Sequence, residues 1–222
     1  MTPGLIIFDC DGVLVDTEPV ANAVMVELLG AEGFKIDVAG AIERFMGKSM
    51  RSVKAEVEAT LGRRLPDGWP DRVRAATLAR FHETGVEAVP GVAGLIHALD
   101  RAGIPLCVAS SGSVAKMTMT LGAAGLYDRL KDVLFTADAV SRGKPAPDLF
   151  LHAARSMGHD PRDAVVIEDS RFGVEAAIAA GMRAFGYVAS GHAQPGRLAA
   201  LGAEEFTEMS DLHEILELEA KT

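Results

Sequence analysis

Between residues 92 and 188 the sequence alternates between apolar, strand-like runs and helical segments, and this alternation restricts the chain to very few folds. We expect strands at 104–109, 133–136, 164–167 and 184–188, and helices at 92–102, 113–122, 147–157 and 172–180. Alternation of this kind implies right-handed crossovers and a parallel sheet with helices on both faces. The four apolar residues at 5–8 are typical of a further strand that is buried on both sides. We therefore predict an α/β fold with a Rossmann-like parallel sheet.

The stretch from residue 18 to residue 87 differs in character, because nothing in it resembles a strand. Four helical segments are expected there, the first of them capped by Thr17 and each followed by glycine. The sequence Val89-Pro90-Gly91 then reads as a linker back to the α/β pattern. These features predict two domains: an α/β core of residues 1–17 and 88–222, and an all-helical domain of residues 18–87 inserted into it.

Charge and composition exclude several classes of function. The formal net charge is −9 and the chain has no basic run, so we expect no nucleic-acid partner. No apolar run approaches 18 residues and the N-terminus lacks a basic region, which favours neither a membrane span nor a signal peptide. The only two cysteines, Cys10 and Cys107, lie in apolar runs as buried thiols would, which favours a cytoplasmic protein. The sequence leaves the choice between a monomer and a weak homodimer open.

Two acidic residues, Asp9 and Asp11, directly follow the first predicted strand. Ligands of open α/β sheets bind at the carboxyl ends of the strands, where these side chains would stand. Two carboxylates about 4 Å apart repel by roughly 4 kcal/mol at an effective dielectric constant near 20. The pair therefore requires a proton or a cation, unless Asp-x-Asp-Gly is only a surface turn here.

Three further strand ends carry polar groups of complementary kinds. Ser110 and Ser111 end one strand and open a helix, and a helix N-terminus binds phosphate well. Lys144 precedes a proline at a rigid corner, from which an ammonium group can hold phosphate oxygens. Glu168 and Asp169 end another strand, and clustered carboxylates suit Mg²⁺. Each feature alone has an ordinary structural explanation, whereas their coincidence favours a site for phosphate and Mg²⁺.

Taken together, the stretches FDCDGVLVDTE, VASSGS, GKPAPD and VVIEDS resemble, in order and spacing, the four motifs of the haloacid dehalogenase (HAD) superfamily of Mg²⁺-dependent phosphotransferases. The helical insert is similar to the four-helix cap of the branch that contains beta-phosphoglucomutases and sugar-phosphate phosphatases. Within that branch the chain looks especially like the bacterial 6-phosphogluconate phosphatases. The resemblance implies an HAD fold with a cap domain.

The resemblance also implies a chemistry: hydrolysis of a small phosphorylated metabolite, such as a sugar or sugar-acid phosphate, through an aspartyl-phosphate on Asp9. An unperturbed aspartate has a pKa of about 3.9, so Asp9 would be ionised at neutral pH. Asp11 would act as the general acid and base. The implied phosphate-binding residues are Ser110, Ser111 and Lys144. The implied Mg²⁺ ligands are Asp9, the backbone carbonyl of Asp11, and Asp169, with Glu168 as a further ligand or a nearby group.

Substrate specificity would belong to the helical insert. Arg44, Lys48 and Arg51 are spaced i, i+4, i+7 and could meet a second anionic group of the substrate, or they could form an ordinary solvated helix face. Lys48 and Ser49 lie where the family's cap loop meets the core.

Two alternatives stay open. Beta-phosphoglucomutases carry a histidine shortly after the first motif and an arginine in the cap loop, where this chain has Ala21 and Met50, with Arg51 displaced by one residue. These departures favour hydrolysis over a phosphomutase reaction. A non-catalytic phosphometabolite-binding protein could lose the two aspartates of the first motif, yet both are present.

Overall fold

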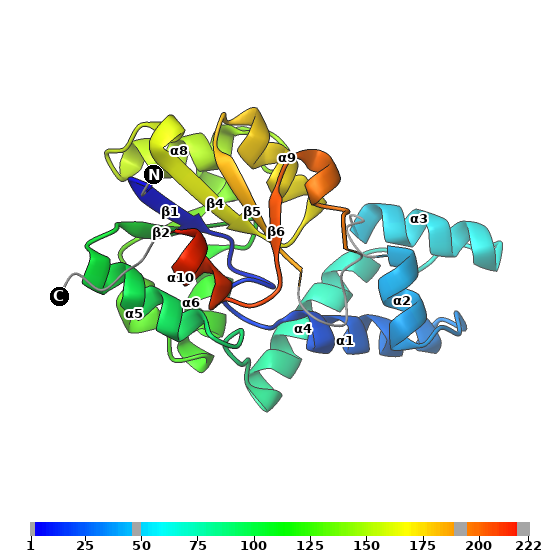
Figure 1. Cartoon of the computed structure of the whole chain (residues 1–222). Coiled ribbons are helices and arrows are strands. Elements are labelled where there is room, and N and C mark those ends of the chain that lie inside the picture. Colours follow the sequence, from blue (N-terminus) through cyan, green and yellow to red (C-terminus); the bar gives the residue numbers. More distant parts are fainter. Residues whose placement is uncertain (1–2, 46–49, 189–194, 217–222) are drawn as a thin grey trace. The chain divides into compact units, whose positions relative to one another are not determined.

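The computed structural model describes residues 3–45, 50–188 and 195–216. The chain divides into two compact units, one made of Met1–Asp16 with Val86–Thr222 and the other of Thr17–Gly85 (Figure 1). The boundaries of the expected core and cap, and the assignment of these roles to the two units, stay predictions. Within the described residues, none of the helices combines the length and apolar character that crossing a membrane requires.

The first unit is built on a six-stranded parallel sheet (Figure 1). Its strands are β1 (Leu5–Phe8), β2 (Leu106–Ser110), β3 (Leu134–Thr136), β4 (Ala164–Glu168), β5 (Arg183–Tyr187) and β6 (Glu204–Phe206). Their order is β3-β2-β1-β4-β5-β6, so β1 lies in the middle, paired with β2 and β4. All four residues of β1 are fully buried, which explains why the run is apolar throughout. The predicted parallel α/β sheet is confirmed.

Helices cover both faces of this sheet. They are α5 (Val92–Ala102), α6 (Val114–Ala123), α7 (Tyr127–Leu130), α8 (Asp148–Ser156), α9 (Arg171–Ala179) and α10 (Asp211–Ile215), with short 3₁₀ turns at Ala137–Ala139, Pro161–Asp163 and Ala199–Leu201. Figure 1 shows α8 and α9 on one face, and α5, α6 and α10 on the other. One core cluster joins the α8–α9 face to alternate strand residues such as Leu5, Ile7 and Val166. This packing on both sides leaves the strand ends as the place for polar groups.

The second unit is all-helical within its described residues. It consists of α1 (Glu18–Ala31), α2 (Val38–Phe45), α3 (Met50–Leu61) and α4 (Trp69–Thr84), packed around a core that includes Leu29, Phe45 and Trp69. The four helices lie close to the expected positions. Thr17 is the residue before α1, but its side chain makes no capping hydrogen bond, because its backbone is already helical rather than extended.

Candidate active site

Three of the polar residues singled out in the sequence lie at the carboxyl end of the sheet. Asp9 follows β1, Ser110 is the last residue of β2, and Glu168 is the last residue of β4. The backbone N–H of Asp9 donates to the carbonyl of Ile167 at 2.9 Å, which continues the pairing of β1 with β4 beyond the last strand residue. Parallel pairing of adjacent strands thus brings residues more than 150 positions apart in the chain to one edge.

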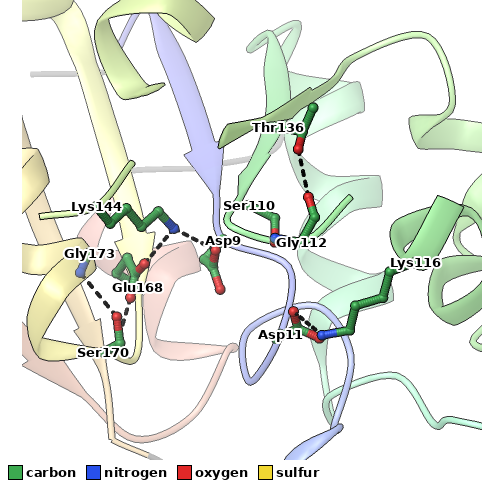
Figure 2. Close-up of polar contacts among 10 residues, drawn as sticks. All are labelled: Asp9, Asp11, Ser110, Gly112, Lys116, Thr136, Lys144, Glu168, Ser170 and Gly173. Atoms are coloured by element: carbon green, nitrogen blue, oxygen red, sulfur yellow. Dashed lines mark hydrogen bonds and ion pairs between the residues drawn. The ribbon is translucent and has the colours of Figure 1, made fainter. Parts of the chain in front are cut away.

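Three charged side chains form a buried group at this edge, here called the Lys144 cluster: Asp9, Lys144 and Glu168. The ammonium of Lys144 donates to Asp9 Oδ1 at 2.6 Å and to Glu168 Oε1 at 2.7 Å (Figure 2). The side chains of the three residues are only 9%, 5% and 1% exposed. Lys144 Nζ also lies 4.8 Å from the centre of the Phe150 ring. Sequence reasoning placed Lys144 at a phosphate site, and the structure adds that the lysine is anchored to two carboxylates.

Burial governs the charge of Asp9. It raises the pKa of Asp9 to about 7, while the neighbouring Lys144 ammonium lowers it and the Glu168 carboxylate raises it further. The expectation that Asp9 is ionised at neutral pH rested on the pKa of an unperturbed carboxyl group, and burial moves the pKa of Asp9 away from that reference. The pKa of Lys144 is raised: burial alone would lower it, but the charges of Asp9 and Glu168 outweigh burial. Charge at Asp9 thus depends on the cations that surround it.

Glu168 is held from two directions. Its Oε1 accepts from Lys144, and its Oε2 accepts from the backbone N–H of Ser170 at 2.7 Å. The Ser170 hydroxyl in turn caps α9 by accepting from Gly173 N at 3.0 Å (Figure 2). Gly173 is required here, because a Cβ at this position would overlap the Glu168 carboxylate. The glycine therefore makes room for a buried acid directly behind Lys144.

A second ion pair, here called the Lys116 pair, joins Lys116 to Asp11. Lys116 Nζ donates to Asp11 Oδ2 at 2.7 Å, and each side chain is 28% exposed (Figure 2). Sequence reasoning missed Lys116, which stands 105 positions from its partner. One local signal was available, since a lysine in the first turn of a helix opposes the helix dipole and so requires an explanation.

The loop between β2 and α6 has a defined geometry. The Ser110 hydroxyl accepts from the backbone N–H of Gly112 at 3.0 Å, and the Thr136 hydroxyl donates to the Gly112 carbonyl at 2.7 Å (Figure 2). Ser110 is buried and Ser111 is exposed. Ser113 caps α6 through a 3.3 Å bond from Lys116 N. The loop thus presents hydroxyls and backbone amides at a helix N-terminus, an arrangement that suits an anion.

Comparison with known proteins identifies the family of this chain. The haloacid dehalogenase-like hydrolase family matches the chain over residues 3–181. The chain belongs to that family. The 6-phosphogluconate phosphatase of Escherichia coli (strain K12) is 30% identical over 210 residues, which cover 95% of this chain and 93% of that protein. Similarity to phosphatases of this kind indicates that this HAD-like hydrolase is a phosphoric monoester hydrolase.

Solved structures agree with the assignment of the chain to the HAD-like family. A conserved HAD-like protein of unknown function from Agrobacterium tumefaciens is 36% identical, has a TM-score of 0.86, and aligns over 96% of this chain and 97% of its own. An HAD family hydrolase from Deinococcus radiodurans, solved with bound phosphate and sodium, is 31% identical with a TM-score of 0.83, over 98% of this chain and 96% of its own. The HAD fold therefore extends over nearly the whole chain.

Oxygen atoms at this edge of the sheet are the candidate ligands for a metal ion. Among the described residues, no three His, Cys, Asp or Glu side chains are grouped so that they alone could hold a metal ion. The Asp169 carboxylate lies against Gly12, where a Cβ would overlap it, and Gly12 adopts φ +80°. The Asp169 carboxylate thus lies next to the loop that contains the Asp11 carbonyl. Oxygen donors alone, with a carboxylate from each of two adjacent strand ends, suit Mg²⁺, which retains several waters.

The residues that were singled out for specificity belong to the helical unit and not to the strand ends of the sheet. Arg44 Nε donates to Glu56 at 2.7 Å, and its guanidinium lies 5.1 Å from the centre of the Phe34 ring. Because α2 ends at Phe45 and α3 begins at Met50, Arg44 and exposed Arg51 lie on different helices, and their contact with a substrate stays a prediction. Lys48 and Ser49 lie outside the described residues.

Proposed function

We propose that the protein is a Mg²⁺-dependent phosphatase that acts in the cytoplasm on a small phosphorylated metabolite, a sugar or sugar-acid phosphate. The observation that carries the proposal is the Lys144 cluster. It places a buried carboxylate, held by an ammonium at 2.6 Å, at the end of the central strand and next to a helix N-terminus. Burial of three charged side chains costs free energy, and clusters of this kind are typical of functional sites.

In the first step, an oxygen of Asp9 attacks the phosphorus of the substrate and a phosphorus–oxygen bond to the alcohol breaks. Asp11 protonates the departing alcohol oxygen, so that no alkoxide is released. The product is an aspartyl-phosphate on Asp9. A phosphoryl transition state needs little covalent help, and positioning and neutralisation of charge supply most of the rate.

In the second step, water attacks the phosphorus of the aspartyl-phosphate while Asp11 takes a proton from that water. The bond between phosphorus and the Asp9 oxygen breaks, which regenerates the carboxylate and releases inorganic phosphate. Asp11 thus returns to its protonated form for the next substrate. The two aspartates, two positions apart on one loop, divide nucleophilic and proton-transfer work between them.

Phosphate oxygens would be held by Lys144, by the Ser110 hydroxyl and by backbone amides near Ser111 and the start of α6. Mg²⁺ would be held by the carboxylates of Asp9 and Asp169 and by the backbone carbonyl of Asp11, and it would neutralise charge on the transferring group. Since both oxygens of Glu168 are engaged by Lys144 and Ser170, we assign Glu168 to positioning Lys144 rather than to the metal.

The helical unit, Thr17–Gly85, would serve as a cap that selects the substrate. The similarity to a 6-phosphogluconate phosphatase supports a substrate with a sugar-acid skeleton. Lys48, Ser49 and Arg51 are the proposed contacts with a second anionic group, whereas the guanidinium of Arg44 is engaged by Glu56 and Phe34. Loss of Lys48 should weaken the binding of 6-phosphogluconate more than the binding of para-nitrophenyl phosphate.

The test is phosphate release from a panel of sugar, sugar-acid and polyol phosphates, with Mg²⁺ or with EDTA, by the wild-type chain and by Asp9→Asn. We expect phosphate release that requires Mg²⁺ and that disappears in Asp9→Asn. Isomerisation of a sugar phosphate without release of phosphate would identify a mutase instead. Binding of a panel member without any turnover would identify a phosphometabolite-binding protein.

A further inference from the structure

Lys116 has no part in the function proposed above, yet its position is specific. It is the third residue of α6, and its ammonium lies 2.7 Å from Asp11 Oδ2, so that the side chain points toward the loop after β1 (Figure 2). Asp11 is the residue that transfers protons in the proposed reaction. The contact therefore joins the proton-transfer residue to a different secondary-structure element of the same unit.

The position is unfavourable for a lysine on local grounds. The N-terminus of a helix carries partial positive charge, so a cation in the first turn is repelled by the aligned backbone dipoles. The side chain is also confined, since only part of it reaches solvent. A residue that violates a local preference is commonly found where function requires it.

The neighbouring loop is shaped so that Lys116 can reach Asp11. A Cβ at Gly112 would lie 3.4 Å from Lys116 Cδ, 3.3 Å from Ser110 Oγ and 3.8 Å from Asp11 Oδ2. The lysine stem thus passes over a glycine whose carbonyl is fixed by Thr136. A side chain at position 112 would press on the stem that carries the ammonium.

We infer that Lys116 is a positioning residue, which holds the Asp11 carboxyl group in the orientation that proton transfer at the leaving oxygen requires. The inference rests on the proposed function, because it assigns Asp11 that role. By holding Oδ2, Lys116 fixes the plane and the reach of the carboxyl group. A general acid must lie within about 3 Å of the oxygen that it protonates, so a carboxyl group that rotates away is ineffective.

The experiment uses substrates that differ in their need for a proton. Glycerol 1-phosphate releases an alkoxide unless it is protonated, whereas para-nitrophenyl phosphate releases a stable phenolate without help. The quantity to measure is kcat/KM with saturating Mg²⁺, because it covers the reaction only up to departure of the alcohol. Wild type is compared with Lys116→Met, Lys116→Gln and Lys116→Arg, and with Lys131→Met as a matched control on the exposed surface of the same unit.

The expected result is a loss of about tenfold or more for glycerol 1-phosphate in Lys116→Met and Lys116→Gln, and of less than about twofold for para-nitrophenyl phosphate. Lys116→Arg should recover most of the loss, and Lys131→Met should match wild type. Thermal unfolding of each variant identifies any that does not fold, and either neutral variant suffices for the comparison.

Equal losses on both substrates, or no loss on either, would overturn the inference. A rise in KM that is confined to substrates with a second anionic group, such as 6-phosphogluconate, would also overturn it, because Lys116 would then contact the substrate directly. Wild-type protein that releases no phosphate from either substrate, or from the sugar and sugar-acid phosphates of the panel, would overturn the proposed function itself. The two failures are therefore distinguishable.

Discussion

The Lys144 cluster and the Lys116 pair lie at the same edge of one sheet, yet they differ in how far water reaches them. The lysine is 5% exposed in the first and 28% exposed in the second. In the cluster, one ammonium serves two carboxylates that have almost no contact with water. In the pair, a single carboxylate is held and water still reaches both partners. From this difference we infer separate roles for similar ion pairs: the buried one holds the scaffold of the site, and the half-exposed one orients a carboxyl group that water can reach.

The largest effect is expected from Lys144→Met, which leaves two acids buried without a counter-ion. We expect phosphatase activity to fall by at least about 1,000-fold, since a charge-stabilising group on the phosphoryl oxygens is lost. The free energy of unfolding should fall by about 3 kcal/mol near neutral pH. Phosphate release and urea denaturation measure the two effects, with Lys131→Met as the control.

The stability loss of Lys144→Met should depend on pH in a defined direction. Burial raises the pKa of Asp9 to about 7 even beside the ammonium, and removal of Lys144 takes away the charge that lowers it. In the variant the pKa of Asp9 therefore rises further, so the folded state keeps a proton that the unfolded state releases above about pH 4. Stability then continues to fall above pH 7, where that of wild type levels off. The deficit relative to wild type should be greater at pH 8 than at pH 5. A deficit that is independent of pH would mean that the charge of Asp9 does not cause the loss of stability.

Glu168→Gln tests whether the cluster depends on its second acid. The amide keeps the shape of the side chain but removes the charge opposite Lys144. We expect a loss of about 2 kcal/mol in the free energy of unfolding, the usual scale for a hydrogen bond to a charged group. Activity should fall by about 100-fold through misplacement of Lys144. If Mg²⁺ affinity falls sharply and stability does not, Glu168 is a metal ligand after all.

The sequence predicted the parts of this edge that local pattern determines. An uninterrupted apolar run such as 5–8 indicates a buried strand, and parallel strands place their carboxyl ends together, so Asp9 and Lys144 could be assigned to one region. β6 was missed because Glu204–Phe206 is a three-residue edge strand with two acids, and edge strands are often short and charged.

Pairings between side chains could not be predicted in this way. Lys116 and Asp11 belong to different elements, and nothing in either segment specifies the other. Glu168 and Asp169 are adjacent in sequence and equivalent in charge, and only the direction of each side chain separates an acid that meets Lys144 from one that lies against Gly12. Sequence reasoning therefore assigned Asp169 to the metal and left Glu168 as either a further ligand or a nearby group. Direction follows from strand register and turn geometry, which require the assembled sheet.

Gly173→Ala makes a smaller change to the cluster without touching any of its charges. The added Cβ would overlap the Glu168 carboxylate, so the acid must shift within a packed interior. We expect a loss of roughly 1–2 kcal/mol in the free energy of unfolding and a modest loss of activity. Gly122→Ala is the matched control, since that helical glycine has no heavy atom within 4 Å of the added Cβ and should gain about 0.5–1 kcal/mol. Equal effects of the two substitutions would contradict the tight fit behind Lys144.

The smallest effect on stability is expected from Lys116→Met. A small effect would separate the half-exposed Lys116 pair from the buried Lys144 cluster. Loss of a half-exposed ion pair costs about 0.2–1 kcal/mol, and removal of a cation from the first turn of α6 returns about 0.3–1 kcal/mol. The two contributions oppose each other, so the free energy of unfolding should change by less than about 1 kcal/mol in either direction. Denaturation in low and high salt checks this, because both contributions are screened and the difference from wild type should shrink further as salt is added. A loss as large as that of Lys144→Met would mean that Lys116 also belongs to the scaffold, and the distinction between a buried anchor and a half-exposed orienting contact would fail.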